Sequence, residues 1–184
     1  MWVVGLAEDR NYYVIDMLRD RLNLTERTKA LIGLRRLYSV GGNPVRGVGY
    51  EDYGLQADIE HIKSVQEQLN YRFEVTPLGG SMDKKTRIRR LVPICEQGRM
   101  YLPDYCIRAN YRKESEDLVR MFLEQEYDDF PVCLHDDMLD ALSRITDEEL
   151  MVAWPEEAAP DQRPAWMKDV IVDQEGSTTA WMGQ

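Results

Sequence analysis

Two short apolar runs open the chain and predict a β-hairpin. Residues 2–7 are rich in valine, and a second run at residues 12–18 follows the polar turn at residues 8–11. Apolar runs of this length, bounded by turn-forming residues, are typical of strands. Apolar residues at helical spacing then predict a helix at residues 25–38, with Thr25 as its N-cap.

The rest of the pattern alternates between strands and helices, which predicts an α/β domain with a mixed sheet. The expected strands are 45–51, 72–77 and 100–102. The expected helices are 55–69, 84–97, 114–126 and 136–145. Pro93 should kink the 84–97 helix, because proline donates no backbone hydrogen bond, and Gly98 should close it.

The regular pattern ends near Asp147, so we expect one domain at residues 1–147. Residues 148–184 are acidic and contain prolines and scattered tryptophans. Such a segment is expected to be poorly ordered or to fold on a partner.

Composition narrows the class of protein. The chain has 184 residues, which suits one domain with a tail. It lacks a long apolar run, so no membrane span is expected. Its three cysteines are irregularly spaced and fit neither a disulfide framework nor a zinc site. The net charge of -10 disfavours a general nucleic-acid binder, although basic residues concentrate between Lys84 and Arg120.

Two groups of carboxylates suggest chemistry. Glu51 ends a predicted strand, where ligand sites gather in open α/β sheets. Asp136, Asp137 and Asp140 occupy the first turn of a predicted helix. Clustered carboxylates suit Mg²⁺, which prefers oxygen ligands. The alternative is structural: an acidic first turn complements the helix dipole, and a glutamate at a strand end is usually solvated.

The order of several motifs resembles the nuclease domain of phage large terminases. That family shows an acidic residue followed by a glycine at a strand end, matched by residues 51–54. A D-K-x-x-R helix start is matched by residues 83–87, and a proline by Pro93. The E-x-G-R turn is matched by residues 96–99 and the late H-D-D-x-x-D-A motif by residues 135–141.

The resemblance implies an RNase H-like mixed sheet flanked by helices, and hydrolysis of double-stranded DNA with two Mg²⁺ or Mn²⁺ ions. Glu51, Asp136 and Asp137 would be catalytic metal ligands, without distinction between the two aspartates. His135 would orient an aspartate. Asp140 would support the site or lie on the helix surface. Lys84 and Arg87 would contact DNA phosphate or serve the structure.

One departure from the family pattern concerns the sheet. The family carries its first catalytic Asp on a central strand, but here residues 2–7 match the family's second strand. By this resemblance the chain lacks the central strand and one carboxylate, and it is inactive alone unless an upstream segment supplies them. It also lacks the Walker-type motif of the terminase ATPase domain.

The partners implied are double-stranded phage DNA, the portal protein, the small terminase subunit and the ATPase domain, in the host cytoplasm and transiently at the procapsid portal. No membrane is implied. Two other interpretations stay open. One is a non-catalytic module that docks on DNA or the portal. The other is a different RNase H-like enzyme, such as a resolvase.

Overall fold

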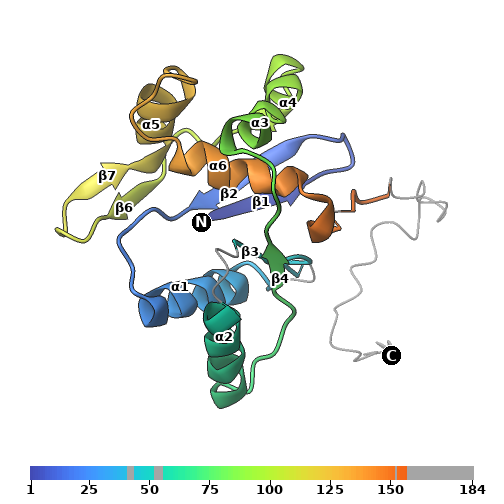
Figure 1. Cartoon of the computed structure of the whole chain (residues 1–184), viewed down its shortest axis with the longest axis vertical. Helices are drawn as coiled ribbons and strands as arrows, with labels where there is room; N and C mark the ends of the chain where they lie inside the picture. Colours follow the sequence, from blue (N-terminus) through green and yellow to red (C-terminus); the bar gives the residue numbers. More distant parts are fainter. Residues whose placement is uncertain (41–43, 52–55, 152, 157–184) are drawn as a thin grey trace, which may run out of the picture.

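The computed structural model describes residues 1–40, 44–51, 56–151 and 153–156, and within them the strands form three small sheets (Figure 1). The first sheet has the order β1-β2-β5, where β1 is Trp2–Leu6, β2 is Tyr12–Met17 and β5 is Met100–Tyr101. β3 (Gly49–Glu51) pairs with β4 (Thr76–Leu78) in parallel, and β6 (Ile107–Ala109) pairs with β7 (Ser115–Asp117) in antiparallel. The described part of the chain is therefore mixed α/β, as predicted.

The helices divide between two regions of the molecule (Figure 1). In the figure α1 and α2 lie below, beside β3 and β4, whereas the remaining α-helices gather above, around the β1–β2 hairpin. The α-helices are α1 (Leu24–Leu37), α2 (Gln56–Gln68), α3 (Lys84–Arg89), α4 (Val92–Glu96), α5 (Leu118–Phe122) and α6 (Asp137–Ser143). One π-helical turn (Leu123–Tyr127) and two 3₁₀ turns (Arg144–Thr146, Glu148–Leu150) complete the elements. No helix of the described residues is long and apolar enough to cross a membrane.

The predicted opening hairpin is confirmed. β1 and β2 pair in antiparallel, with a shift in register between Val3 and Val4. Val14 and Met17 are buried in the main core, and Trp2 and Val4 pack against it. The same core contains the apolar faces of α3 to α6.

Asp16 is the one acidic side chain that β2 buries, and several protein groups donate hydrogen bonds to its carboxylate. It accepts hydrogen bonds from Arg108, from the Tyr38 hydroxyl at 2.8 Å and from the Met17 N–H at 2.8 Å. Burial alone would raise the pKa of Asp16, but these donors outweigh burial and lower it. Asp16 thus joins β2 to α1 and β6 as an ionised group.

The boundaries of several elements differ from the prediction for local reasons. The cap of α1 is Asn23, not Thr25: the Asn23 side chain accepts from the Glu26 N–H, and Glu26 accepts from the Asn23 N–H. This reciprocal pair satisfies two otherwise unpaired backbone donors. The predicted strand 45–51 shortens to Gly49–Glu51, and the predicted strand 72–77 is shorter and shifted, at Thr76–Leu78.

Two predicted helices are wrong in their extent. The single kinked helix at 84–97 is two helices, α3 and α4, because Pro93 sits in the first turn of a new helix, where a missing N–H costs nothing. Gly98 closes α4 with a φ of 65°, as expected. The predicted helix 114–126 begins too early, since residues 115–117 form β7, which was not expected. Asp117 then caps α5 by accepting from the Val119 N–H.

The first part of the predicted tail is ordered, which differs from expectation. Trp154 meets the Tyr12 ring edge-on at 4.9 Å, and the Leu150 side chain lies close to Gly49. These contacts extend the packed chain beyond Asp147. The rest of the predicted tail, residues 157–184, lies outside the described residues.

β1 and β3 are both edge strands: among the described residues, each has a strand partner on one side alone. β1 pairs only with β2, and β3 pairs only with β4. β1 contains the residues that the motif resemblance matched to the family's second strand. All five β1 residues are only half-buried although the strand is apolar. An exposed apolar edge is a template for intermolecular strand pairing.

We therefore expect the isolated chain to aggregate through β1. Val3 lies outside the core cluster, so Val3→Lys should slow aggregation at 37 °C several-fold, as followed by light scattering, with little change in melting temperature. Val92→Lys, on the exposed surface of α4, is the matched control and should change neither. A sharp, reversible melt of a monomeric wild-type chain would contradict the expectation.

Candidate functional site

A buried ion pair joins α3 to α6. Arg87 Nε donates to Asp140 Oδ1 at 2.7 Å, and Arg87 Nη2 donates to Asp140 Oδ2 at 2.8 Å. Both residues are less than a tenth exposed. This two-bonded geometry matches the planar guanidinium to the carboxylate and fixes the relative position of the two helices.

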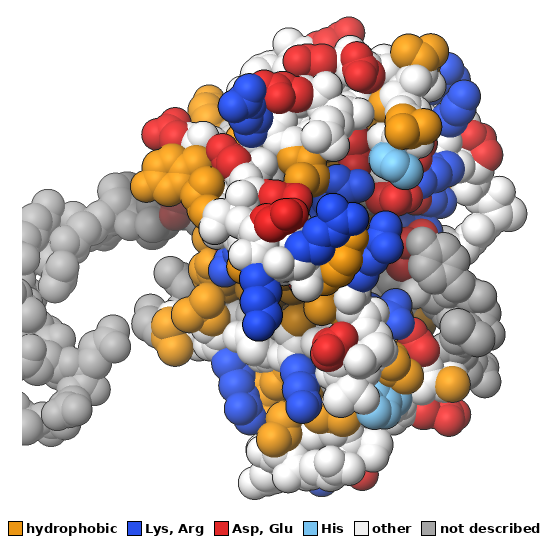
Figure 2. Space-filling model, turned by 90° about the vertical axis from the view of Figure 1, so that its left-hand side faces the viewer, with side chains coloured by type: hydrophobic (Ala, Val, Ile, Leu, Met, Phe, Trp, Pro, Cys, Tyr) orange, Lys and Arg blue, Asp and Glu red, His pale blue; other side chains and the backbone are white. Residues whose placement is uncertain are grey.

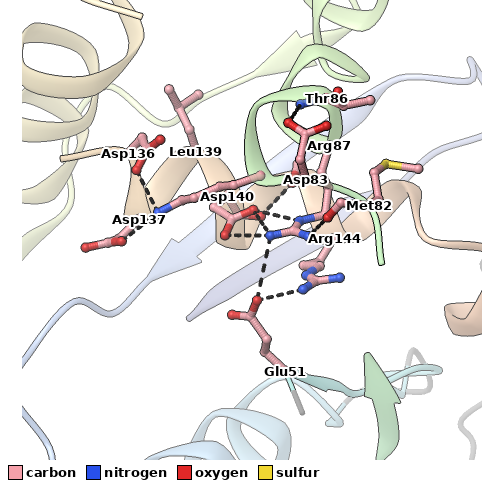
Figure 3. Close-up of polar contacts among 12 residues, drawn as sticks. Glu51, Met82, Asp83, Thr86, Arg87, Asp136, Asp137, Leu139, Asp140 and Arg144 are labelled. Atoms are coloured by element: carbon pink, nitrogen blue, oxygen red, sulfur yellow. Dashed lines mark hydrogen bonds and ion pairs between the residues drawn. The ribbon is translucent and has the colours of Figure 1, made fainter. Parts of the chain in front are cut away.

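Glu51 reaches the same cluster from the end of β3 (Figure 3). Its Oε1 accepts a hydrogen bond from Arg144 Nη2 at 2.6 Å and lies 3.9 Å from Arg87 Nη2. Arg144 also binds Asp147 at 3.0 Å, and Asp147 binds Arg90 at 2.8 Å. Side-chain ion pairs therefore connect β3 with α6 and the segment after it.

Lys84 holds the other two aspartates. Its Nζ lies 2.6 Å from Asp136 Oδ1 and 2.9 Å from Asp137 Oδ1. Lys84 precedes Arg87 by three residues, about one turn of α3. Two oxygens from neighbouring residues thus converge on one positive charge.

Local sequence explains how these groups are positioned. Asp83 caps α3 by accepting from the Thr86 N–H at 3.0 Å, which orients Lys84 and Arg87 three residues apart on one side of the helix. At the start of α6, the fully buried Glu126 accepts from the Met138 and Leu139 N–H groups at 2.8 and 3.0 Å. Glu126 therefore caps α6 from a distant π-helical turn and fixes where Asp136 and Asp137 emerge.

The charges in the site shift one another's pKa values. Burial lowers the pKa of Lys84, but the hydrogen bonds to Asp136 and Asp137 outweigh it, so the net shift is upward. The bond from Lys84 lowers the pKa of Asp137. Burial raises the pKa of Asp140 more than Arg87 lowers it. Lys84 and Asp137 are thus firmly charged at neutral pH.

The structure divides the predicted ligands into two groups. Asp136 and Asp137 share Lys84, while Glu51 meets Asp140 through Arg87. Within the described ranges, no three His, Cys, Asp or Glu side chains are grouped closely enough to hold a metal ion. His135 is exposed beside the first group.

Asp140, Arg87 and Lys84, which were expected to support the site, differ in how exposed they are. Asp140 is buried, so its expected place on the helix surface is wrong, and its support of Arg87 is what the contacts provide. Arg87 is buried as well, which favours the structural one of its two expected roles. The Lys84 side chain is more exposed than that of Arg87, so it is the more accessible of the two to a ligand.

Comparisons with known proteins place the chain in no family. No family model, curated protein or solved structure matches it.

Sequence reasoning missed Arg144, Asp147 and Glu126. Arg144 and Asp147 follow α6 three residues apart, a spacing that could have indicated a pair. No sequence pattern indicated the role of Glu126, because the groups that donate to it are backbone N–H groups twelve and thirteen residues away.

Breaking the buried pair should destabilise the fold. Asp140→Asn removes the charge that pairs closely with the buried Arg87 and leaves the more distant Glu51, at 3.9 Å, to compensate it, which costs about 3–5 kcal/mol. Urea unfolding measures the change in free energy. The control is Glu124→Gln, which breaks the exposed Arg120–Glu124 pair and should cost less than about 1 kcal/mol. Equal costs for the two variants would contradict a structural role for Asp140.

Glu126 should make stability depend on pH. Burial raises its pKa, and its bonds to the Met138 and Leu139 N–H groups only partly offset this. The folded state therefore holds this proton more tightly than the unfolded chain. Its contribution is full at pH values below the ordinary glutamate range and is lost as pH rises through the folded-state pKa.

Glu126→Gln removes that titration and keeps an oxygen that can accept from α6. The fall in melting temperature from pH 5 to pH 7.5 should thus be smaller in the variant than in the wild type. Glu124→Gln should retain the wild-type profile. An unchanged profile in Glu126→Gln would exclude Glu126 as the source.

Proposed function

We propose that this chain is the metal-dependent endonuclease domain of a phage DNA-packaging terminase, which cleaves double-stranded DNA by two-metal hydrolysis. The observation that carries the proposal is the convergence of Asp136 and Asp137 on a single cation, the Lys84 ammonium, at 2.6 and 2.9 Å. Adjacent carboxylates that already hold one cation are suited to a divalent ion. The mixed α/β class and the order of the sequence motifs also support it.

The residues fit part of a two-metal site. Asp136 and Asp137 offer oxygens to one ion, and Glu51 lies at the end of β3, where it accepts from Arg144. Bound ions of this kind activate water and stabilise the leaving oxygen during phosphodiester hydrolysis. The further carboxylate that would join Glu51 to the aspartates is, in this proposal, the Asp of the family's central strand.

The edge positions of β1 and β3 suit this completion. A strand between them would satisfy backbone groups on both sides and carry its acidic residue toward β3. In the proposal an upstream segment or polypeptide supplies that strand, and the chain is inactive without it. The RNase H-like fold is then the complete arrangement, of which the two small sheets are the flanking parts.

The chain's own side chains take distinct roles. Asp136 and Asp137 would hold metal, with His135 orienting one of them. Lys84 competes with a cation for the same oxygens, so metal binding would release its ammonium toward a DNA phosphate. Arg87 and Asp140 would position α3 against α6 rather than touch the substrate.

A second candidate is a non-catalytic module that docks on DNA or the portal protein. It is favoured by one observation: each predicted metal ligand is already paired with a lysine or arginine. In this reading Lys84 and Arg144 replace the metal permanently. The portal protein, small terminase subunit and terminase ATPase domain would be partners under either proposal, in the host cytoplasm and at the procapsid portal.

Nicking of supercoiled plasmid with Mn²⁺ tests the first proposal. The chain alone should nick weakly or not at all, and the chain extended upstream by one strand should nick. In the extended protein, Asp136→Asn should reduce the rate at least about tenfold, since it removes a metal ligand. Asp128→Asn, an exposed aspartate outside the cluster, is the control. Intact DNA with the extended wild-type protein would overturn the proposal.

Calorimetric titration with Mn²⁺ separates the two candidates. Binding that disappears in Asp136→Asn counts against pure docking, because a docking module has no use for the ion.

A further inference from the structure

α1 is positively charged in a strongly acidic protein. It carries four basic residues, Arg27, Lys29, Arg35 and Arg36, against one acidic residue, Glu26. The whole chain has a net charge of -10. A local excess of this size on one helix sets up a positive potential that the total conceals.

Two of these arginines are held by aromatic rings. The Arg35 guanidinium carbon lies 4.5 Å from the centre of the Phe73 ring and 5.4 Å from that of Tyr71. The Arg36 guanidinium carbon lies 4.6 Å from the Tyr71 ring. Arg35 also donates to the Tyr71 hydroxyl at 2.6 Å, and the two rings meet edge-on at 5.7 Å. We call these four residues the arginine–aromatic cluster.

The cluster is not neutralised by carboxylates. Among the described residues, neither Arg35 nor Arg36 forms an ion pair, whereas Arg27 on the same helix pairs with Asp58. Arg36 is exposed, and so is Arg72, which lies between the two ring residues in the sequence. Figure 2 shows basic side chains beside hydrophobic ones on the lower part of the molecule, where Figure 1 places α1 and α2.

The helix dipole explains only half of this arrangement. Arginines in the last turn complement the partial negative charge of a helix C-terminus, and that favours Arg35 and Arg36 in any helix. It does not require two aromatic rings to hold them. A ring contact restricts the orientations of a guanidinium without cancelling its charge, and a guanidinium has five N–H donors that can bind phosphate. Arg35 uses one of these donors on the Tyr71 hydroxyl, and Arg36 is exposed.

We propose that the arginine–aromatic cluster binds the phosphate backbone of double-stranded DNA, away from the Lys84–Asp136 site. The ligand class follows from charge and geometry: two adjacent, oriented guanidiniums without carboxylates match the repeating phosphates of a duplex. The choice of double-stranded DNA rests on the proposed function. The cluster anchors the duplex through its backbone and reads no sequence.

Fluorescence anisotropy with a labelled duplex of about 20 base pairs tests this. The full chain is titrated in EDTA at 50 and 200 mM NaCl. Arg35→Gln/Arg36→Gln should weaken binding by about fivefold or more at 50 mM NaCl and reduce the salt slope by about two, one for each lost phosphate contact. Arg36→Gln alone should give a smaller loss in the same direction, and because Arg36 is exposed it should leave the fold intact.

Arg112→Gln/Lys113→Gln is the matched control. It removes the same charge from two exposed neighbours, one of which stacks on Tyr111. Its affinity should stay within about twofold of the wild type. Equal losses in both double variants would overturn the proposal, as would undetectable wild-type binding at 50 mM NaCl. Equally strong competition by poly-glutamate, per charge, would instead assign the cluster to an acidic protein.

EDTA separates this inference from the nuclease proposal. Binding that depends on Arg35 and Arg36, together with no metal-dependent nicking, would overturn the proposed hydrolysis alone. Nicking by the extended protein that is indifferent to both arginines would overturn the cluster alone.

Discussion

The buried pair between Arg87 and Asp140 is the interaction on which the candidate site depends. Two charges less than a tenth exposed are tolerable because the paired hydrogen bonds between them compensate both, so a shift of α3 against α6 carries a large electrostatic cost. Because the position of α3 against α6 is fixed, Lys84 lies within reach of Asp136 and Asp137. Glu51 is drawn to the same helices through Arg144. The carboxylates are therefore ordered by basic residues.

The same network joins parts of the molecule that backbone hydrogen bonds leave apart. Within the described residues, the β1-β2-β5 sheet and the β3–β4 pair share no ladder. Arg144 connects them indirectly, because it binds Glu51 at the end of β3 and Asp147 just after α6. Side-chain ion pairs are weaker and more adaptable than a strand ladder. The proposed function uses this property, because its additional strand would lie between two sheets that share no ladder.

Local patterns in the sequence predicted most helices and strands, but they did not predict which distant residues contact one another. The apolar runs of β1 and β2 and the helical spacing of α1 were sufficient, because each buries one face. Pro93 is compatible with a kink or with a new first turn, and only packing decides between them. β7 was missed because Ser115, Glu116 and Asp117 have little strand propensity and depend on pairing with β6. Likewise the acidic motif at residues 135–141 was visible, but Arg87 lies 53 residues from Asp140, and Arg144 lies 93 from Glu51.

Lys84 and Arg36 differ in what an anionic ligand must displace in order to bind them. Lys84 is neutralised by Asp136 and Asp137, so an anion reaches it only after a cation takes over those carboxylates. Arg36 rests on the Tyr71 ring, which stabilises the guanidinium without cancelling its charge, so a phosphate needs to displace only water. In the two proposals, DNA affinity and metal dependence are separable properties of one chain. The proposed protein holds DNA at α1, while Lys84 occupies Asp136 and Asp137 until a metal ion displaces it.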